Sequence, residues 1–160
     1  MTAADSPLLI AYDGSDAARR AIREAAALFG SRDALVVTVW EPGLAYEATA
    51  LPNAGMEMAP MPLDVEEAHE LEQTLEVEAR RIAEEGAELA RSVGLQAQAL
   101  VVADESNVAN AIVEQARTRG MAAIIVGSRG LTGLRARLEG STSNAVLKHA
   151  PCPVVVVHDD

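Results

Sequence analysis

A glycine-rich segment near the end of this 160-residue chain carries the residue types best suited to chemistry. Residues 127–144 read GSRGLTGLRARLEGSTSN, and the nine residues 129–137 hold three arginines and no acid. Glycine lets a backbone approach a ligand without side-chain clash. Hydroxyls at the start of a helix lie beside unpaired N–H groups and the positive end of the helix dipole. A polyphosphate binds amides, hydroxyls and cations together, so this segment predicts a phosphate site.

The simpler alternative is a loop whose Ser or Thr only caps the following helix. Capping requires one such residue and neither glycines nor arginines, so we favour phosphate binding. Two familiar phosphate signatures are excluded. A P-loop needs a Gly-Lys pair, which the chain lacks. A dinucleotide fingerprint needs Gly-x-Gly-x-x-Gly after the first strand, where residues 13–16 read DGSD.

Hydrophobic periodicity predicts the elements that position this segment. Apolar or β-branched runs indicate five strands, at residues 8–12, 34–40, 95–101, 121–126 and 153–157. Apolar positions spaced by three and four indicate helices between them, at residues 16–29, 64–93, 108–119 and 142–149. This alternation predicts a parallel sheet with helices on both faces. In such sheets ligands bind beyond the carboxyl ends of the strands, where the strand order reverses, which directs attention to Asp13, Val39 and Gly127.

Composition narrows the class of protein. The formal net charge of −11 opposes attraction to nucleic acid or to anionic membranes. The single cysteine excludes an internal disulfide. The first residues show no basic or apolar leader, and no apolar run approaches the ~20 residues that cross a bilayer. We expect one cytoplasmic domain over residues 1–160, with a long connection at 41–63 that is a lid, a contact surface or a solvated insertion.

The longest predicted helix, at residues 64–93, is densely acidic outside its buried seam. Its glutamates are Glu66, Glu67, Glu70, Glu72, Glu76, Glu78, Glu84, Glu85 and Glu88. These side chains point around the helix and not toward one centre. We therefore interpret them as a solvated face rather than a cation site.

The pattern Gly127-x2-Gly130-x9-Gly140-Ser141 resembles the nucleotide-binding motif of the universal stress protein family. Supporting matches are YDGS at residues 12–15, VGSRG at 126–130 and PCPVVV at 151–156. The likeness spans essentially the whole chain apart from the 41–63 connection. Within the family this glycine pattern tends to separate members that bind ATP from those that do not. The resemblance therefore implies bound ATP, or ADP or AMP, with Mg²⁺.

The resemblance also implies a fold and a set of contacts. The family fold is a Rossmann-like α/β domain whose five-stranded parallel sheet has the order 3-2-1-4-5. Asp13 is expected near the ribose or a phosphate-bound Mg²⁺, although an aspartate in that turn also suits a helix cap, as does Ser15. The other implied contacts are Ala11 and Tyr12 with the nucleoside, Val39 with adenine, Val126 and Gly127 with the ribose, and Gly130, Gly140, Ser141, Thr142 and Ser143 with the phosphates. Arg129 is added as a phosphate contact because of its charge.

The last predicted strand bears on assembly. The resemblance places this valine-rich strand at the edge of the sheet, and an exposed apolar edge invites pairing with another chain. We therefore expect a homodimer joined through Pro153 to His158.

The function that these residues favour is nucleotide-dependent regulation in a stress response. One alternative is a slow ATP hydrolase or phosphoryl-transfer enzyme, for which Glu139 is the nearby carboxylate. A second alternative is an interaction module without a ligand.

Overall fold

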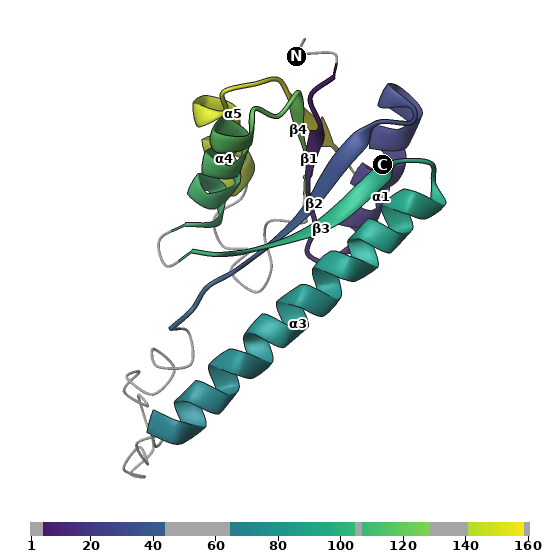
Figure 1. The fold of residues 1–160 in the computed structure, drawn as a ribbon. Coiled ribbons are helices and arrows are strands. Elements are labelled where there is room, and N and C mark those ends of the chain that lie inside the picture. Colours follow the sequence, from purple (N-terminus) through teal and green to yellow (C-terminus); the bar gives the residue numbers. More distant parts are fainter. Residues whose placement is uncertain (1–4, 44–64, 105–106, 129–140, 159–160) are drawn as a thin grey trace.

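The computed structural model describes residues 5–43, 65–104, 107–128 and 141–158, with the backbone alone at residues 141–143 (Figure 1). Most of the predicted 41–63 connection lies outside these ranges, as do Arg129, Gly130 and Gly140. Within the described ranges, no helix is both long and apolar enough to cross a membrane.

The strands form one parallel sheet. They are β1 (Leu8–Ala11), β2 (Asp33–Trp40), β3 (Gln96–Ala103), β4 (Ala123–Gly127) and β5 (Val154–Val157). Their order is β3-β2-β1-β4-β5, and every neighbouring pair is parallel. This confirms the expected fold class and strand order.

The helices cover both faces of the sheet (Figure 1). One face is covered by α1 (Asp16–Phe29) and α3 (Val65–Ser92), and the other by α4 (Val108–Arg119) and α5 (Ser141–His149). The helix ends follow local chemistry. Ser15 and Asn107 cap the starts of α1 and α4 through their side chains, while Gly30 and Gly120 end those helices with positive φ.

An aliphatic core lies on each side of the sheet. Every residue of β1 and of β4 is buried, as expected for central strands covered on both faces. The face under α1 and α3 buries Leu8, Ile10 and Ile125, and the face under α4 and α5 buries Leu9 and Ile124. Each such side chain contributes roughly 1.5–3 kcal/mol on leaving water. The core therefore holds the ends of the two central strands in a fixed relation.

The helix α3 is much longer than the strands it covers. Its 28 residues span about 42 Å, and Figure 1 shows its first half running past the sheet. The second half buries Ala79, Ala83, Ala87 and Ala90, and Ala87 and Ala90 belong to the core that this helix forms with the sheet. Small side chains allow the helix and sheet backbones to approach closely here.

Candidate functional site

The predicted site lies where β1 and β4 end side by side. The two strands are hydrogen-bonded neighbours, with Ile10 opposite Ile125. The chain leaving β1 continues into α1 on one face, whereas α5, which follows β4, packs on the other. The strand order therefore reverses between β1 and β4, which is where parallel α/β sheets form a ligand crevice.

A short, self-bonded turn connects β1 to α1. The Ser15 amide donates to Oδ1 of Asp13 at 2.9 Å, and the Ala18 amide donates to Oγ of Ser15 at 3.1 Å. Gly14 has a φ of +83°, a conformation that side chains disfavour. Ser15 is thus the cap of α1, and the exposed Asp13 carboxylate shapes the turn before it.

Tyr12 is held by the protein through all of its polar groups. The residue is 2 % exposed, and its ring packs on the face under α1 and α3. Its amide donates to the Val37 carbonyl at 2.9 Å, its carbonyl accepts from the Thr38 hydroxyl at 2.9 Å, and its own hydroxyl donates to Glu85 at 2.8 Å. Burial, reinforced by Glu85, raises the pKa of the Tyr12 hydroxyl. The ring is therefore a core residue, and only the main chain of Tyr12 reaches the edge of the sheet.

Three predicted nucleoside residues share the face covered by α4 and α5. Ala11 and Val126 are buried there, and Val39 packs against them half-buried. Val39 lies two residues beyond Val37, which pairs with Ala11, so β2 continues past the end of β1. Of these three, Val39 alone offers appreciable exposed aliphatic surface, whereas the side chains of Ala11 and Val126 are covered.

Gly127 ends β4 against the first turn of α1. It is buried, and the nearby backbone of Ala17 leaves no room for a side chain. The family resemblance implies a ribose contact for this glycine. The structure also gives a packing reason for a glycine at this position, because the backbones of β4 and α1 are in close contact here.

A helix begins in the segment for which the sequence predicts a phosphate site. The helix α5 begins at Ser141, with Thr142 and Ser143 in its first turn, one residue earlier than the predicted 142–149. Because α5 links two parallel strands, its start lies toward the carboxyl edge of the sheet. Its first amides have no partner within the helix and favour an anion.

The contacts of Glu85 show that not every glutamate of the acidic helix belongs to a solvated face. Glu85 was assigned to the solvated face of α3, yet its Oε1 accepts from Arg19 at 2.6 Å and from Tyr12 at 2.8 Å. Its Oε2 accepts from Arg81 at 3.3 Å. The pKa of Glu85 is lowered, chiefly by the hydrogen bond from Arg19 and secondly by the one from the Tyr12 hydroxyl. Residues 12 and 85 are too distant in sequence for a local pattern to link them.

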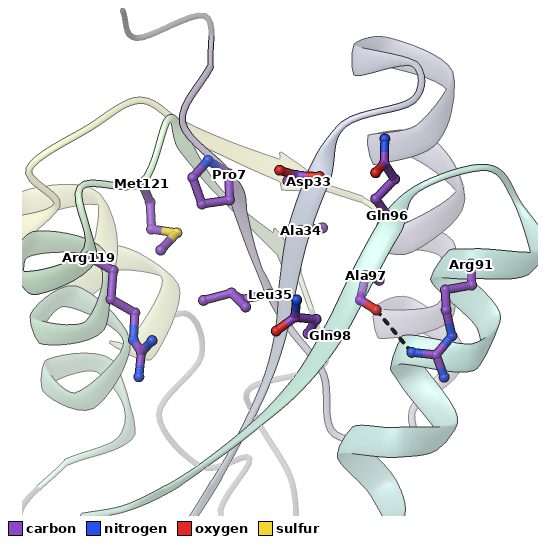
Figure 2. A pocket seen from close by; sticks show the side chains of 10 residues that line it. All are labelled: Pro7, Asp33, Ala34, Leu35, Arg91, Gln96, Ala97, Gln98, Arg119 and Met121. Atoms are coloured by element: carbon purple, nitrogen blue, oxygen red, sulfur yellow. Dashed lines mark hydrogen bonds between the residues drawn. The ribbon is translucent and has the colours of Figure 1, made fainter. Parts of the chain in front are cut away.

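A hollow of about 580 Å³ lies at the opposite, amino edge of the sheet (Figure 2). Its lining includes Pro7, Asp33 and Gln96, at or before the starts of strands, and Arg119 at the end of α4. Figure 2 shows the Arg91 side chain turned back onto the Ala97 carbonyl, to which it donates at 2.9 Å. Of the predicted nucleotide contacts whose side chains the structure describes, none lines this hollow.

Comparison with known proteins identifies the family. The model of the universal stress protein family matches residues 6–158. The chain belongs to the universal stress protein family. One curated relative, the universal stress protein YxiE of Bacillus subtilis (strain 168), is 29% identical over 150 residues, which are 94% of this chain and 97% of the relative.

Solved structures of the family share the fold. The universal stress protein of Archaeoglobus fulgidus in complex with dAMP aligns with a TM-score of 0.57 at 22% identity, covering 95% of this chain and 97% of that one. An Arabidopsis thaliana family protein with AMP bound aligns with a TM-score of 0.63 at 16% identity, covering 97% and 92%. These TM-scores show a common architecture.

Proposed function

We propose that this universal stress protein is a nucleotide-binding regulatory protein that holds ATP, or ADP or AMP, with Mg²⁺. The observation that carries the proposal is the junction of β1 and β4, where the strand order reverses and where the Asp13 turn follows β1. The helix α5, which connects β4 to β5, begins toward the same edge of the sheet. Fold relatives with AMP and dAMP support an adenine nucleotide. We take residues 1–160 to act as one cytoplasmic domain.

The proposed contacts form three groups, which hold the nucleoside, the ribose or Mg²⁺, and the phosphates. Adenine and ribose rest against the half-buried Val39, beside the main chain of Ala11, Tyr12, Val126 and Gly127. The exposed Asp13 carboxylate serves the ribose or the phosphate-bound Mg²⁺, because carboxylate oxygens suit that hard cation. The proposed phosphate contacts are Arg129, Gly130, Gly140, Ser141, Thr142 and Ser143.

Binding serves regulation by favouring whichever conformation contacts the nucleotide more. The state favoured by ATP then differs in the surface it presents to a partner protein. The 41–63 connection is one place where such a difference can arise.

We also propose a homodimer joined through Pro153 to His158. β5 is an edge strand, and Val154 to Val156 are only half-buried. Beside it, α1 exposes Leu28 to 62 %. A second copy pairing along this edge would satisfy its free backbone groups and cover the apolar surface. Sedimentation at micromolar concentration tests this, and a monomer would contradict it.

Two measurements test nucleotide binding. Protein purified without added nucleotide is denatured, and the supernatant is analysed for ATP, ADP and AMP. Stripped protein is then heated with and without Mg-ATP. We expect a thermal shift, because a ligand at 100 times its Kd adds about 2.7 kcal/mol to stability.

The phosphate contacts are tested by the double change Gly140→Ala and Ser141→Ala, which should abolish that shift. Ser31→Ala is the control, because Ser31 is exposed in the connection between α1 and β2, on the amino side of the sheet. An undiminished shift in the double variant would contradict the assigned phosphate site.

A further inference from the structure

We propose that Glu85 and Thr38 are positioning residues of the nucleotide site, which act by fixing the turn that carries Asp13. This rests on the proposed function and names the groups that prepare the site for its ligand. Neither residue lies in the glycine-rich motif. Both act through Tyr12, from different elements.

Glu85 holds the turn from both of its ends. Before the turn, the Tyr12 hydroxyl donates to Glu85 Oε1 at 2.8 Å. After the turn, the Arg19 guanidinium donates to the same oxygen at 2.6 Å. One carboxylate of α3 therefore fixes the residue that precedes Asp13 and the first turn of α1, which follows it. Neutralising or removing this carboxylate loosens both ends together.

Thr38 holds the main chain of Tyr12. Thr38 is 5 % exposed, and among the described residues it is the one polar residue that counts as buried. Its hydroxyl donates to the Tyr12 carbonyl at 2.9 Å. The regular pairing of β1 with β2 ends at Ala11 and Val37, and this hydrogen bond extends the attachment one residue further. The peptide group that joins Tyr12 to Asp13 is thereby held in place.

A fixed peptide group places the Asp13 carboxylate. One of its oxygens accepts from the Ser15 amide, so the side chain already has one defined direction before any ligand binds. Within this proposal its second oxygen serves the nucleotide-bound Mg²⁺, because carboxylate oxygens suit that hard cation. Removing a group that orients a metal ligand commonly costs 10- to 100-fold in affinity. We expect the loss of either group to weaken Mg-ATP affinity about tenfold, at the lower end of this range, because the other group still holds the Asp13 turn.

The experiment compares two affinities in stripped full-length protein. Glu85→Gln and Thr38→Val are titrated with Mg-ATP, and separately with adenosine, which has neither phosphate nor metal. Glu84→Gln is the matched control, because Glu84 is the adjacent residue of α3 and pairs with Arg91, away from the turn. Thr38→Ser keeps the hydroxyl and serves as the conservative rescue. Amide hydrogen exchange at residues 13–18 is measured in all variants without ligand.

We expect Glu85→Gln and Thr38→Val each to weaken Mg-ATP binding about tenfold, while adenosine affinity changes less than about threefold. Exchange at residues 13–18 should accelerate in both variants, and Glu84→Gln and Thr38→Ser should behave like the wild type. Equal losses for Mg-ATP and adenosine, or unchanged affinity for both, would overturn the positioning role. If the wild type bound no Mg-ATP while exchange responded as expected, the proposed function itself would fall, and the nucleotide role of these residues with it.

Discussion

The backbone of Ala17 lies so close to Gly127 that an added Cβ would come within 2.8 Å of the Ala17 carbonyl carbon and oxygen. A real Cβ does not approach backbone atoms this closely, so any side chain at Gly127 forces α1 and β4 apart. The start of α1 and the end of β4 flank the proposed nucleotide site. Their contact therefore joins the packing of the fold to the geometry of the site.

Gly127→Ala should lower the free energy of unfolding by about 1–3 kcal/mol, as overpacking of a dense core commonly does. It should also weaken Mg-ATP binding, because the Asp13 turn and the end of β4 separate. Denaturant unfolding and nucleotide titration measure the two effects. Ser128→Ala, one residue further on, adds no atoms and is the control. Wild-type stability in Gly127→Ala would show that the contact can relax.

In Gly86→Ala, a gain in helix propensity and a cost of overpacking have opposite effects on the free energy of unfolding. Alanine favours a helix interior by roughly 0.5–1 kcal/mol over glycine. At Gly86, however, a Cβ would lie 2.6 Å from Cδ1 of Tyr12 and 2.7 Å from Cγ1 of Val36. Overpacking costs typically about 1–3 kcal/mol, so the net change should be destabilising.

Chemical denaturation measures that change. Gln73→Ala, at an exposed position of the same helix, should be neutral or slightly stabilising and calibrates the propensity effect. A stabilised Gly86→Ala would mean that the Tyr12 ring moves aside at little cost.

Asp13→Asn and Ser15→Ala should separate ligand binding from helix capping. Asparagine keeps an oxygen that can accept from the Ser15 amide, so stability should change by less than about 0.5 kcal/mol, as at most surface positions. Mg-ATP affinity should fall because a charge is lost. Ser15→Ala should cost about 1 kcal/mol of stability, because the cap of α1 is removed. Thermal unfolding and Mg-ATP titration of both variants test these two roles. A loss of stability in Asp13→Asn together with a loss of affinity in Ser15→Ala alone would refute them.

The pH dependence of stability should carry a contribution from Glu85. Its folded-state pKa lies below the ordinary value of 4.5, chiefly because Arg19 bonds to its ionised form. The folded protein then binds fewer protons than the unfolded chain, so this stabilisation is present above pH 4.5 and is lost as pH falls through the folded-state pKa. The side chain is 36% exposed, so solvent screening limits the contribution to less than about 1 kcal/mol.

Unfolding free energies from neutral to acidic pH measure this contribution. Glu85→Gln should lose stability at neutral pH and differ progressively less from the wild type in acid. Glu84→Gln controls for the loss of one charge. A difference between wild type and Glu85→Gln that stayed constant with pH would contradict the pairing with Arg19.

Local patterns were sufficient to predict most elements of the fold. The apolar run at 121–126 predicted a strand, and β4 forms there and is buried throughout. The helix predicted at residues 108–119 has those bounds in the structure, and Gly120 ends it with a φ of +61°. Strand boundaries differ from the predicted ones by one or two residues. The strand order itself came from the family resemblance, because periodicity describes faces and says nothing about neighbours.

The supports of the site could not be predicted in this way. Glu85 was one glutamate among nine on the predicted long helix, and nothing near it in sequence marks it as different. Its partner Tyr12 is 73 residues away, and Thr38 lies 26 residues from the same tyrosine. Such contacts arise from how α3 and β2 pack beside β1. They become visible only when those elements are placed together.

A crystal structure of the stripped protein with Mg-ATP tests the central proposal most directly. We expect adenine and ribose beyond the ends of β1 and β4, next to Val39 and Asp13, and the phosphates at the amides that begin α5. Nucleotide bound instead in the hollow at the amino edge of the sheet, or an empty junction at saturating Mg-ATP, would contradict it.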